Sequence, residues 1–344
     1  QFNKRITTVS ELSKYINLKP KEKDEISQVL KKYRMSITPY YANLMNKENP
    51  EDPIRKIAIP SSAELFGPVK GPDEKEELKA MPIKGIRQRY PDRALIILSY
   101  RCPNYCRFCF RKRWIGQVDE ELSYSEIDEA IEYVQKDVTL REMIVTGGEP
   151  LILDENKLEY ILQALRSIKH VEIIRIGERI PATLPSRITQ ELTKLLGKYK
   201  PIYIVTHFDH PREINVLSKR ACDMLADAGI PLFNQTVLLK NINDNLKTLR
   251  DLFLGLLSMR IKPYYLFHCI DTLGTAHFVT KVGIGANIIK RLQCYISGLA
   301  LPNYVIPTYY GKIPITYNFV LNHNRNILTL ENYKGEVFKF TEPI

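Results

Sequence analysis

Three cysteines lie within eight residues, at Cys102, Cys106 and Cys109, in the segment SYRCPNYCRFCFRKR. Thiolates are the usual ligands of iron–sulfur clusters and of structural zinc ions. Three thiolates can hold three irons of a cubane cluster and leave the fourth iron open for chemistry. A structural zinc ion would want a fourth ligand nearby, and no second CxxC pair occurs in the sequence. The spacing therefore predicts a [4Fe–4S] cluster on these three cysteines.

A glycine pair, Gly147 and Gly148, ends another apolar run in the segment IVTGGEP. Glycine leaves the backbone open, so a polar ligand group could approach it without obstruction by a side chain. Alone this signal is weak, because glycine pairs also make ordinary turns. His207 follows a further apolar run, and Cys102 follows the first of them.

The elements that would position these residues alternate along the chain. Apolar strands are expected at 93–100, 140–148, 171–177, 201–208, 231–239 and 261–269, with amphipathic helices between them. This alternation predicts an α/β fold with a parallel sheet, open or closed. In such folds the chemistry lies at the C-terminal ends of the strands, where the special residues fall here.

The change in sequence pattern along the chain divides it into three regions. Residues 1–88 are predicted to be a helical N-terminal region, in which prolines separate short helices and 67–85 form an exposed connection. Residues 89–300 form the βα core, and residues 301–344 form a short β-rich C-terminal segment.

The composition favours a cytoplasmic globular protein. The 344 residues carry a net charge of +11, from 50 Lys and Arg against 39 Asp and Glu, and the basic residues are scattered. Without a nucleic-acid-binding motif, a solvated surface explains this charge better than a nucleic-acid partner. The sequence contains no apolar run long enough for a membrane span, and its first residues lack the apolar centre of a secretory signal.

The cysteine pattern, with aromatic Phe108 before the last cysteine, resembles the first motif of the radical S-adenosylmethionine superfamily, and TGGEP resembles its second. Segments along nearly the whole chain, including RMSITPYY, YPDRALII, HVEIIRIGERIPATLPSRIT and ADAGIPLFNQTVLLKNIND, are similar to lysine 2,3-aminomutase and its relatives. The resemblance implies a partial (β/α)6 TIM-like barrel and three cofactors: a [4Fe–4S] cluster, S-adenosylmethionine and pyridoxal 5′-phosphate.

The resemblance also implies roles for individual residues. Lys312 would bind pyridoxal as an imine, Arg93 would bind its phosphate, and Phe267 would face its ring. The alternative for Arg93 is an ion pair with Asp92. Arg111 would hold the substrate carboxylate, a task suited to a planar two-pronged donor. The residues implied in binding S-adenosylmethionine are Gly147, Gly148, Glu149, His207 and Gln235. Arg107, Lys112 and Arg113 could neutralise cofactor charge or belong to the surface.

The residues expected to contact the substrate side chain differ from those of the family. The two aspartates that bind the distal ammonium of lysine fall on Ile270 and Val305, and Asp271 is expected to point to the opposite face. A buried ammonium without a charge partner costs several kcal/mol, so lysine is a poor substrate candidate. Tyr309 and Tyr310 replace small glycines, which suggests a smaller or less polar side-chain pocket.

The implied activity is 1,2-amino migration on a free amino acid through a 5′-deoxyadenosyl radical. A different radical outcome, such as side-chain decarboxylation, stays open, and modification of RNA or protein is a weaker alternative. A one-electron donor such as flavodoxin or ferredoxin is implied as a partner. We also expect a homo-oligomer, although Asn245 stands where the family has a zinc-binding cysteine.

Overall fold

The computed structural model describes residues 2–67, 80–112, 114–117, 119–308, 311–316, 319–325, 327–332 and 334–342. Its N-terminal part consists of short helices: α1 (Val9–Leu12), α2 (Pro20–Leu30), α3 (Pro39–Ala42), α4 (Pro53–Ala58) and the 3-10 turn η2 (Ser62–Leu65). The hydroxyl of Thr38 caps α3, and Pro39 takes a first-turn position, where its missing N–H is not needed. The prolines therefore begin helices as well as separating them. Most of the predicted connection at 67–85 lies outside the described residues.

Nine strands form one sheet in sequence order, from β1 (Ile86–Tyr90) to β9 (Gly311–Pro314). Both of these edge strands pair antiparallel with their neighbours. The central strands are parallel: β2 (Arg93–Ile97), β3 (Glu142–Thr146), β4 (Ile173–Gly177), β5 (Ile202–Thr206), β6 (Leu232–Leu238), β7 (Ile261–His268) and β8 (Asn303–Thr308). The six predicted strands are β2 to β7, so the predicted α/β barrel type is confirmed, and β8 extends it by one parallel strand.

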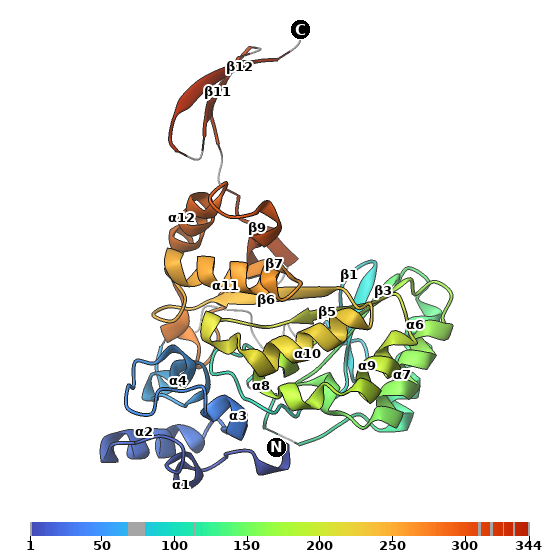
Figure 1. Cartoon of the computed structure of the whole chain (residues 1–344). Helices are drawn as coiled ribbons and strands as arrows, with labels where there is room; N and C mark the ends of the chain where they lie inside the picture. Colours follow the sequence, from blue (N-terminus) through green and yellow to red (C-terminus); the bar gives the residue numbers. More distant parts are fainter. Residues whose placement is uncertain are drawn as a thin grey trace.

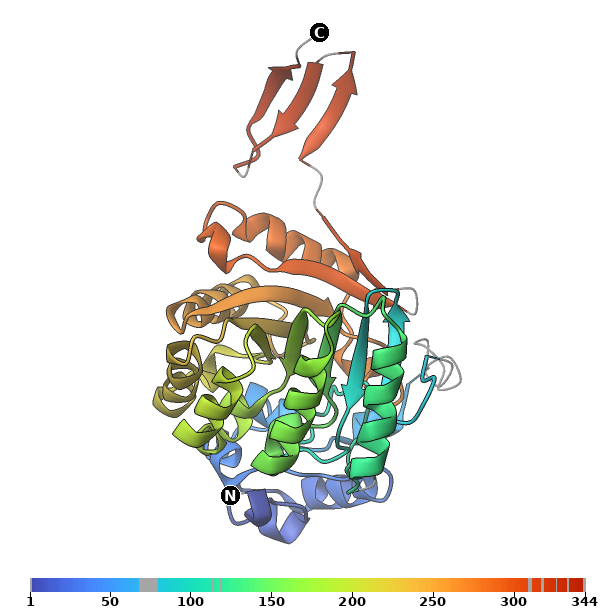
Figure 2. The same ribbon diagram turned by 90° about the vertical axis from the view of Figure 1, so that its right-hand side faces the viewer.

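Helices cover the outer face of this sheet, as Figures 1 and 2 show. The long ones are α6 (Tyr124–Lys136), α7 (Glu155–Ser167), α9 (Gln190–Gly197), α10 (Val216–Asp227), α11 (Leu246–Ser258) and α12 (Val282–Leu292), and α8 (Ile180–Thr183) is short. Their apolar faces and the strands bury one large core, which includes Ile96, Val145 and Phe253. Asn245, where the family has a zinc ligand, caps α11 by accepting a hydrogen bond from the Thr248 N–H at 2.9 Å.

A second, smaller core joins the N-terminal helices to the barrel. Leu12, Tyr41 and Ile57 from the N-terminal region are buried together with Leu239 and Phe278, which follow β6 and β7. The N-terminal helices thus pack at the C-terminal ends of the strands, the edge where the sequence predicts the chemistry.

The C-terminal residues form an antiparallel sheet of β10 (Val320–Asn324), β11 (Ile327–Glu331) and β12 (Val337–Thr341). This sheet stands apart from the barrel in both views (Figures 1 and 2). An ion pair of 2.9 Å between Lys290 of α12 and Glu331 connects the two parts. Within the described residues, no helix combines the length and the apolar character that crossing a membrane requires.

Candidate active site

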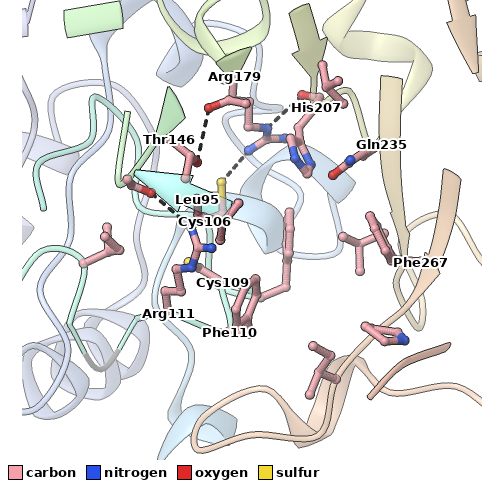
Figure 3. A pocket seen from close by; sticks show the side chains of 18 of the residues that line it. Leu95, Cys106, Cys109, Phe110, Arg111, Thr146, Arg179, His207, Gln235 and Phe267 are labelled. Atoms are coloured by element: carbon pink, nitrogen blue, oxygen red, sulfur yellow. Dashed lines mark hydrogen bonds between the residues drawn. The ribbon is translucent and has the colours of Figure 1, made fainter. Parts of the chain in front are cut away.

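A cavity of about 600 Å³ lies at the C-terminal ends of the strands. It brings together residues that the sequence spreads over more than two hundred positions. Twelve of the predicted site residues line it: Arg93, Cys102, Cys106, Cys109, Arg111, Gly147, Gly148, His207, Gln235, Phe267, Ile270 and Lys312. Glu149 and Val305 do not. Figure 3 shows how Cys106, Cys109, Arg111, His207 and Phe267 converge on this space.

The cysteine loop follows β2 and is held in place by the N-terminal region. The guanidinium of Arg5 donates to the Cys102 carbonyl at 3.0 Å, and the Tyr105 N–H donates to the Ser36 carbonyl at 2.8 Å. In the described part of the chain, no three His, Cys, Asp or Glu side chains surround a single metal-ion position. The three cysteines line one cavity, as ligands of a shared cluster must.

Arg107 and Lys112, which the sequence left between cofactor contact and surface, are both buried. Arg107 forms a two-pronged ion pair with Glu64, at 2.9 and 2.5 Å, and Lys112 binds the same carboxylate at 2.9 Å. Although burial alone would raise the pKa of Glu64, the two cations hold that pKa below its usual range. These side chains therefore anchor the cysteine loop to η2 instead of facing solvent.

The glycine pair after β3 packs against the backbone of the cysteine loop. A Cβ on Gly148 would lie 2.2 Å from the Arg101 carbonyl oxygen, and one on Gly147 would lie 2.4 Å from the Ser99 oxygen. Gly147 also has a φ of +148°. Only glycine permits this close approach, which brings the backbone just after β3 beside the cysteine loop.

Glu149, which the resemblance assigns to S-adenosylmethionine, is 1% exposed and does not line the described cavity, and its role stays a prediction. Its two carboxylate oxygens accept the backbone N–H groups of Leu151 and Arg179, at 3.1 and 2.7 Å. Burial raises the pKa of Glu149 to about 8. Glu149 thus braces the loops after β3 and β4.

Lys312 lies on β9 with its amine facing aromatic rings. Its Nζ is 4.6 Å from the centre of the Tyr265 ring and 5.6 Å from that of Phe267. Burial, with the neighbouring cations Arg175 and Arg93, lowers the pKa of Lys312 to about 8. Sequence reasoning missed Arg175 and Tyr265, although their alternation along β4 and β7 could have indicated cavity-facing positions.

Arg93 also has acidic neighbours. Its guanidinium lies 3.4 Å from Asp92 and 3.8 Å from Glu142, and it stacks 4.5 Å above the ring of Tyr90. The ion pair considered as the alternative for Arg93 is therefore present, although Arg93 still lines the cavity.

Two more arginines flank the cysteines (Figure 3). Arg111 donates to the Gly147 carbonyl at 3.5 Å. Arg179, which sequence reasoning missed, follows β4 and lies with Nη1 2.6 Å from Cys106 Sγ. His207 lies next to Arg179. Burial, with the positive charges of Arg179 and Arg111, lowers the pKa of His207 to about 3, so its imidazole is neutral at physiological pH.

At the other end of the cavity, Ile270 is a lining residue and Asp271 is not, as the sequence predicts. Val305, which the sequence assigns to the substrate pocket, is 1% exposed and does not line the described cavity, so that assignment stays a prediction. Pro307 and Thr308, farther along β8, face the cavity instead. Tyr309, Tyr310 and Arg113 lie outside the described residues.

The charge of the cavity wall is strongly unequal. Among the described lining residues Glu178 is the one carboxylate, whereas ten are Arg or Lys. The ten are Arg34, Arg87, Arg89, Arg93, Arg107, Arg111, Lys112, Arg175, Arg179 and Lys312. Arg107 and Lys112 are already paired with Glu64, and Arg179 with Asp209 and Glu213, so the other cations are the ones that favour ligands with carboxylate or phosphate groups.

Comparisons with known proteins agree with this arrangement. The family model described as the radical SAM superfamily matches residues 96–253. The L-lysine 2,3-aminomutase of Acetoanaerobium sticklandii is 43% identical, over 100% of this chain and 84% of that protein. The chain belongs to the lysine 2,3-aminomutase family.

Other family members differ in the substrate that they are named for. The glutamate 2,3-aminomutase of Clostridioides difficile is 41% identical over 99% of this chain and 82% of its own length. The L-lysine 2,3-aminomutase of Bacillus subtilis is 37% identical over 100% of this chain and 74% of its own. The protein is thus a radical S-adenosylmethionine aminomutase, and membership of the superfamily implies a [4Fe–4S] cluster and S-adenosylmethionine.

Proposed function

We propose that the protein is a pyridoxal-phosphate-dependent aminomutase for a free amino acid other than lysine, with a small or apolar side chain. The observation that carries the proposal is the environment of Lys312, whose amine shares one cavity with the three cysteines. A desolvated amine between aromatic faces and arginines suits the ring and phosphate of pyridoxal phosphate. This environment supports the use of that cofactor.

The cluster on Cys102, Cys106 and Cys109, with S-adenosylmethionine, supplies when bound the radical that removes a substrate hydrogen, and pyridoxal carries the migrating amino group. Lys312 releases its proton near pH 8, which provides a nucleophilic amine. Arg93 and Arg175 bind the phosphate.

Two further residues complete the site. Arg111 holds the substrate carboxylate, and neutral His207 provides a hydrogen-bonding group for S-adenosylmethionine without adding charge. Both groups line the cavity and are partly buried, so they orient bound ligands next to the reacting atoms.

The choice of substrate rests on the charges at the cavity wall. Relatives that are 43% and 41% identical carry the names of lysine and glutamate enzymes, so identity over the whole chain does not fix the substrate. With Ile270 and Pro307 at the pocket wall, the distal ammonium of lysine would have no carboxylate there. Leaving that charge unpaired costs several kcal/mol.

We further propose a one-electron donor such as flavodoxin or ferredoxin, a homo-oligomeric assembly, and a cytoplasmic location. The divisions at 1–88, 89–300 and 301–344 are proposed as the domain organisation, with Lys312 in the last part.

The test is the visible spectrum of anaerobically reconstituted protein with pyridoxal phosphate. An imine band that is lost in Lys312→Ala and retained in Lys281→Ala, a change to an exposed lysine outside the cavity, supports the proposal. A protein that binds the cluster but takes up no pyridoxal phosphate contradicts it.

Product analysis then identifies the reaction and the substrate. Amino acids incubated with S-adenosylmethionine and a reductant should give a β-amino acid, whereas loss of carbon dioxide would indicate fragmentation instead. Efficient formation of β-lysine would show that the argument against lysine is wrong.

A further inference from the structure

Arg179 occupies the centre of a largely buried polar network beside the cysteine loop. Its Nη1 lies 2.6 Å from Cys106 Sγ, and its Nε donates to the His207 carbonyl at 3.0 Å. Its Nη2 lies 2.6 Å from a Glu213 oxygen and 3.0 Å from Asp209. The guanidinium thus has one edge on a cysteine sulfur and the other on two carboxylates.

Glu213 fixes the orientation of Arg179. This carboxylate is 0% exposed, and one of its oxygens also accepts the Tyr41 hydroxyl at 2.6 Å. Its second oxygen accepts the N–H groups of Asp209 and His210, at 2.6 and 3.1 Å. Since every direction around Glu213 is used, Arg179 cannot rotate away from Cys106 without breaking several buried hydrogen bonds.

We propose that Arg179 is a positioning residue that donates a charged hydrogen bond to the Cys106 sulfur and thereby stabilises the reduced form of the cluster. This inference rests on the proposed assignment of Cys106 as a cluster ligand. Reduction adds one electron, taken from the one-electron protein donor, and therefore adds negative charge to the cluster and its sulfurs. A cationic donor at the sulfur favours that state, because hydrogen bonds to the sulfurs help to set the reduction potential. Arg179 neither gains nor loses a proton in this step.

The negative charges around Arg179 outnumber its single positive charge. Asp209 and Glu213, both of which are 0% exposed, lie within 3.0 Å of its guanidinium. Removing the guanidinium would leave two carboxylates and a cluster thiolate close together without a cation.

The experiment is a spectroelectrochemical titration of the cluster in the reconstituted full chain, followed by electron paramagnetic resonance. Arg179→Met should retain its iron but shift the one-electron equilibrium at least tenfold toward the oxidised form, a midpoint lower by about 59 mV. Arg179→Lys keeps the positive charge but cannot span Cys106 and Glu213 together, so its midpoint should lie between those of Arg179→Met and the unchanged protein. Arg55→Met removes another buried arginine, paired with Glu22 at 2.8 Å, and should leave the midpoint unchanged.

Two further variants distinguish a wrong assignment of the cluster ligands from a wrong role for Arg179. Cys106→Ala should lose the cluster, and if it binds iron normally, the assignment of the ligands is wrong. Normal iron content with an unchanged midpoint in both Arg179→Met and Arg179→Lys overturns the role of Arg179 alone. The double variant Arg179→Met with Glu213→Gln removes one of the two carboxylates left unpaired, and Asp209 remains. If this variant recovers the full midpoint, charge balance and not the hydrogen bond to sulfur is responsible, and the inference fails.

Discussion

Replacing Glu64 by glutamine should destabilise the protein by about 3 to 5 kcal/mol at pH 6.5, the usual cost of removing one partner from a buried ion pair. Glu64 is 1% exposed and binds two cations, the guanidinium of Arg107 and the ammonium of Lys112. The glutamine amide accepts hydrogen bonds through one oxygen instead of two and neutralises neither charge. The change therefore leaves two buried cations in contact and loosens the cysteine loop from η2.

The cost should fall as the pH rises, because Lys112 can lose its proton. Burial lowers the pKa of Lys112 to about 8 even with Glu64 beside it, so loss of Glu64 must lower that pKa further. At pH values between this lower pKa and about 8, Lys112 is still protonated in the unchanged protein but has lost its proton in the variant. The variant therefore gains about 1.4 kcal/mol per pH unit relative to the native protein in that window.

The assay is equilibrium unfolding in urea, followed by circular dichroism at pH 6.5 and pH 8, on the protein without cofactors and under reducing conditions. Glu132→Gln is the matched control, since its ion pair with Lys136 lies on the surface of α6 and should change stability by about 0.5 kcal/mol or less. If Glu64→Gln is as stable as this control, or if its cost is the same at both pH values, the assignment of a buried charged triad is refuted.

Other changes test separate parts of the site. Gly148→Ala should reduce iron incorporation and lower the melting temperature, because its Cβ would lie 2.2 Å from the Arg101 oxygen. Gly283→Ala, in α12 with no atom within 4 Å of the new Cβ, should raise the melting temperature slightly, and equal effects of the two changes would contradict the packing argument. Capture of pyridoxal phosphate by Lys312, measured by absorbance, should increase through about pH 8, and a midpoint near 10.5 would show that its amine is not desolvated. His207 should show no imidazole titration by NMR between pH 5 and 8, since its pKa is lowered to about 3, and a titration in that range would mean that its surroundings are wetter than described.

The local sequence was sufficient for the arrangement of the barrel and for several of the residues that line the cavity. Alternating apolar strands and amphipathic helices identified β2 to β7, because the two periodicities differ along the chain. Residues just after those strands, such as Cys102 and His207, could then be assigned to one edge, since parallel strands end on the same side. The family resemblance supplied Lys312 and Arg111, which spacing alone does not distinguish from surface cations.

The orientation of side chains and their contact partners could not be predicted from the local sequence. Val305 and Glu149 fall near the cavity along the chain but point elsewhere, because the register of β8 and the backbone donors around Glu149 fix their orientation. Arg107 needs Glu64, which lies 43 positions earlier, and the sequence gives no indication of that contact.

The sequence by itself determined that this chain gathers three cysteines, a glycine-lined strand end and a lysine in an α/β barrel of the lysine 2,3-aminomutase family. Local patterns carry the barrel, the cysteines and the glycines, since strand periodicity and ligand spacing extend over a few residues, and the family resemblance adds the lysine. Only the tertiary structure decided which charges meet: Glu64 with the cysteine loop, and Arg179 with Cys106 on one side and Glu213 on the other. These contacts depend on desolvation and distance between segments remote in the chain, and both quantities exist only once the N-terminal helices have packed onto the barrel.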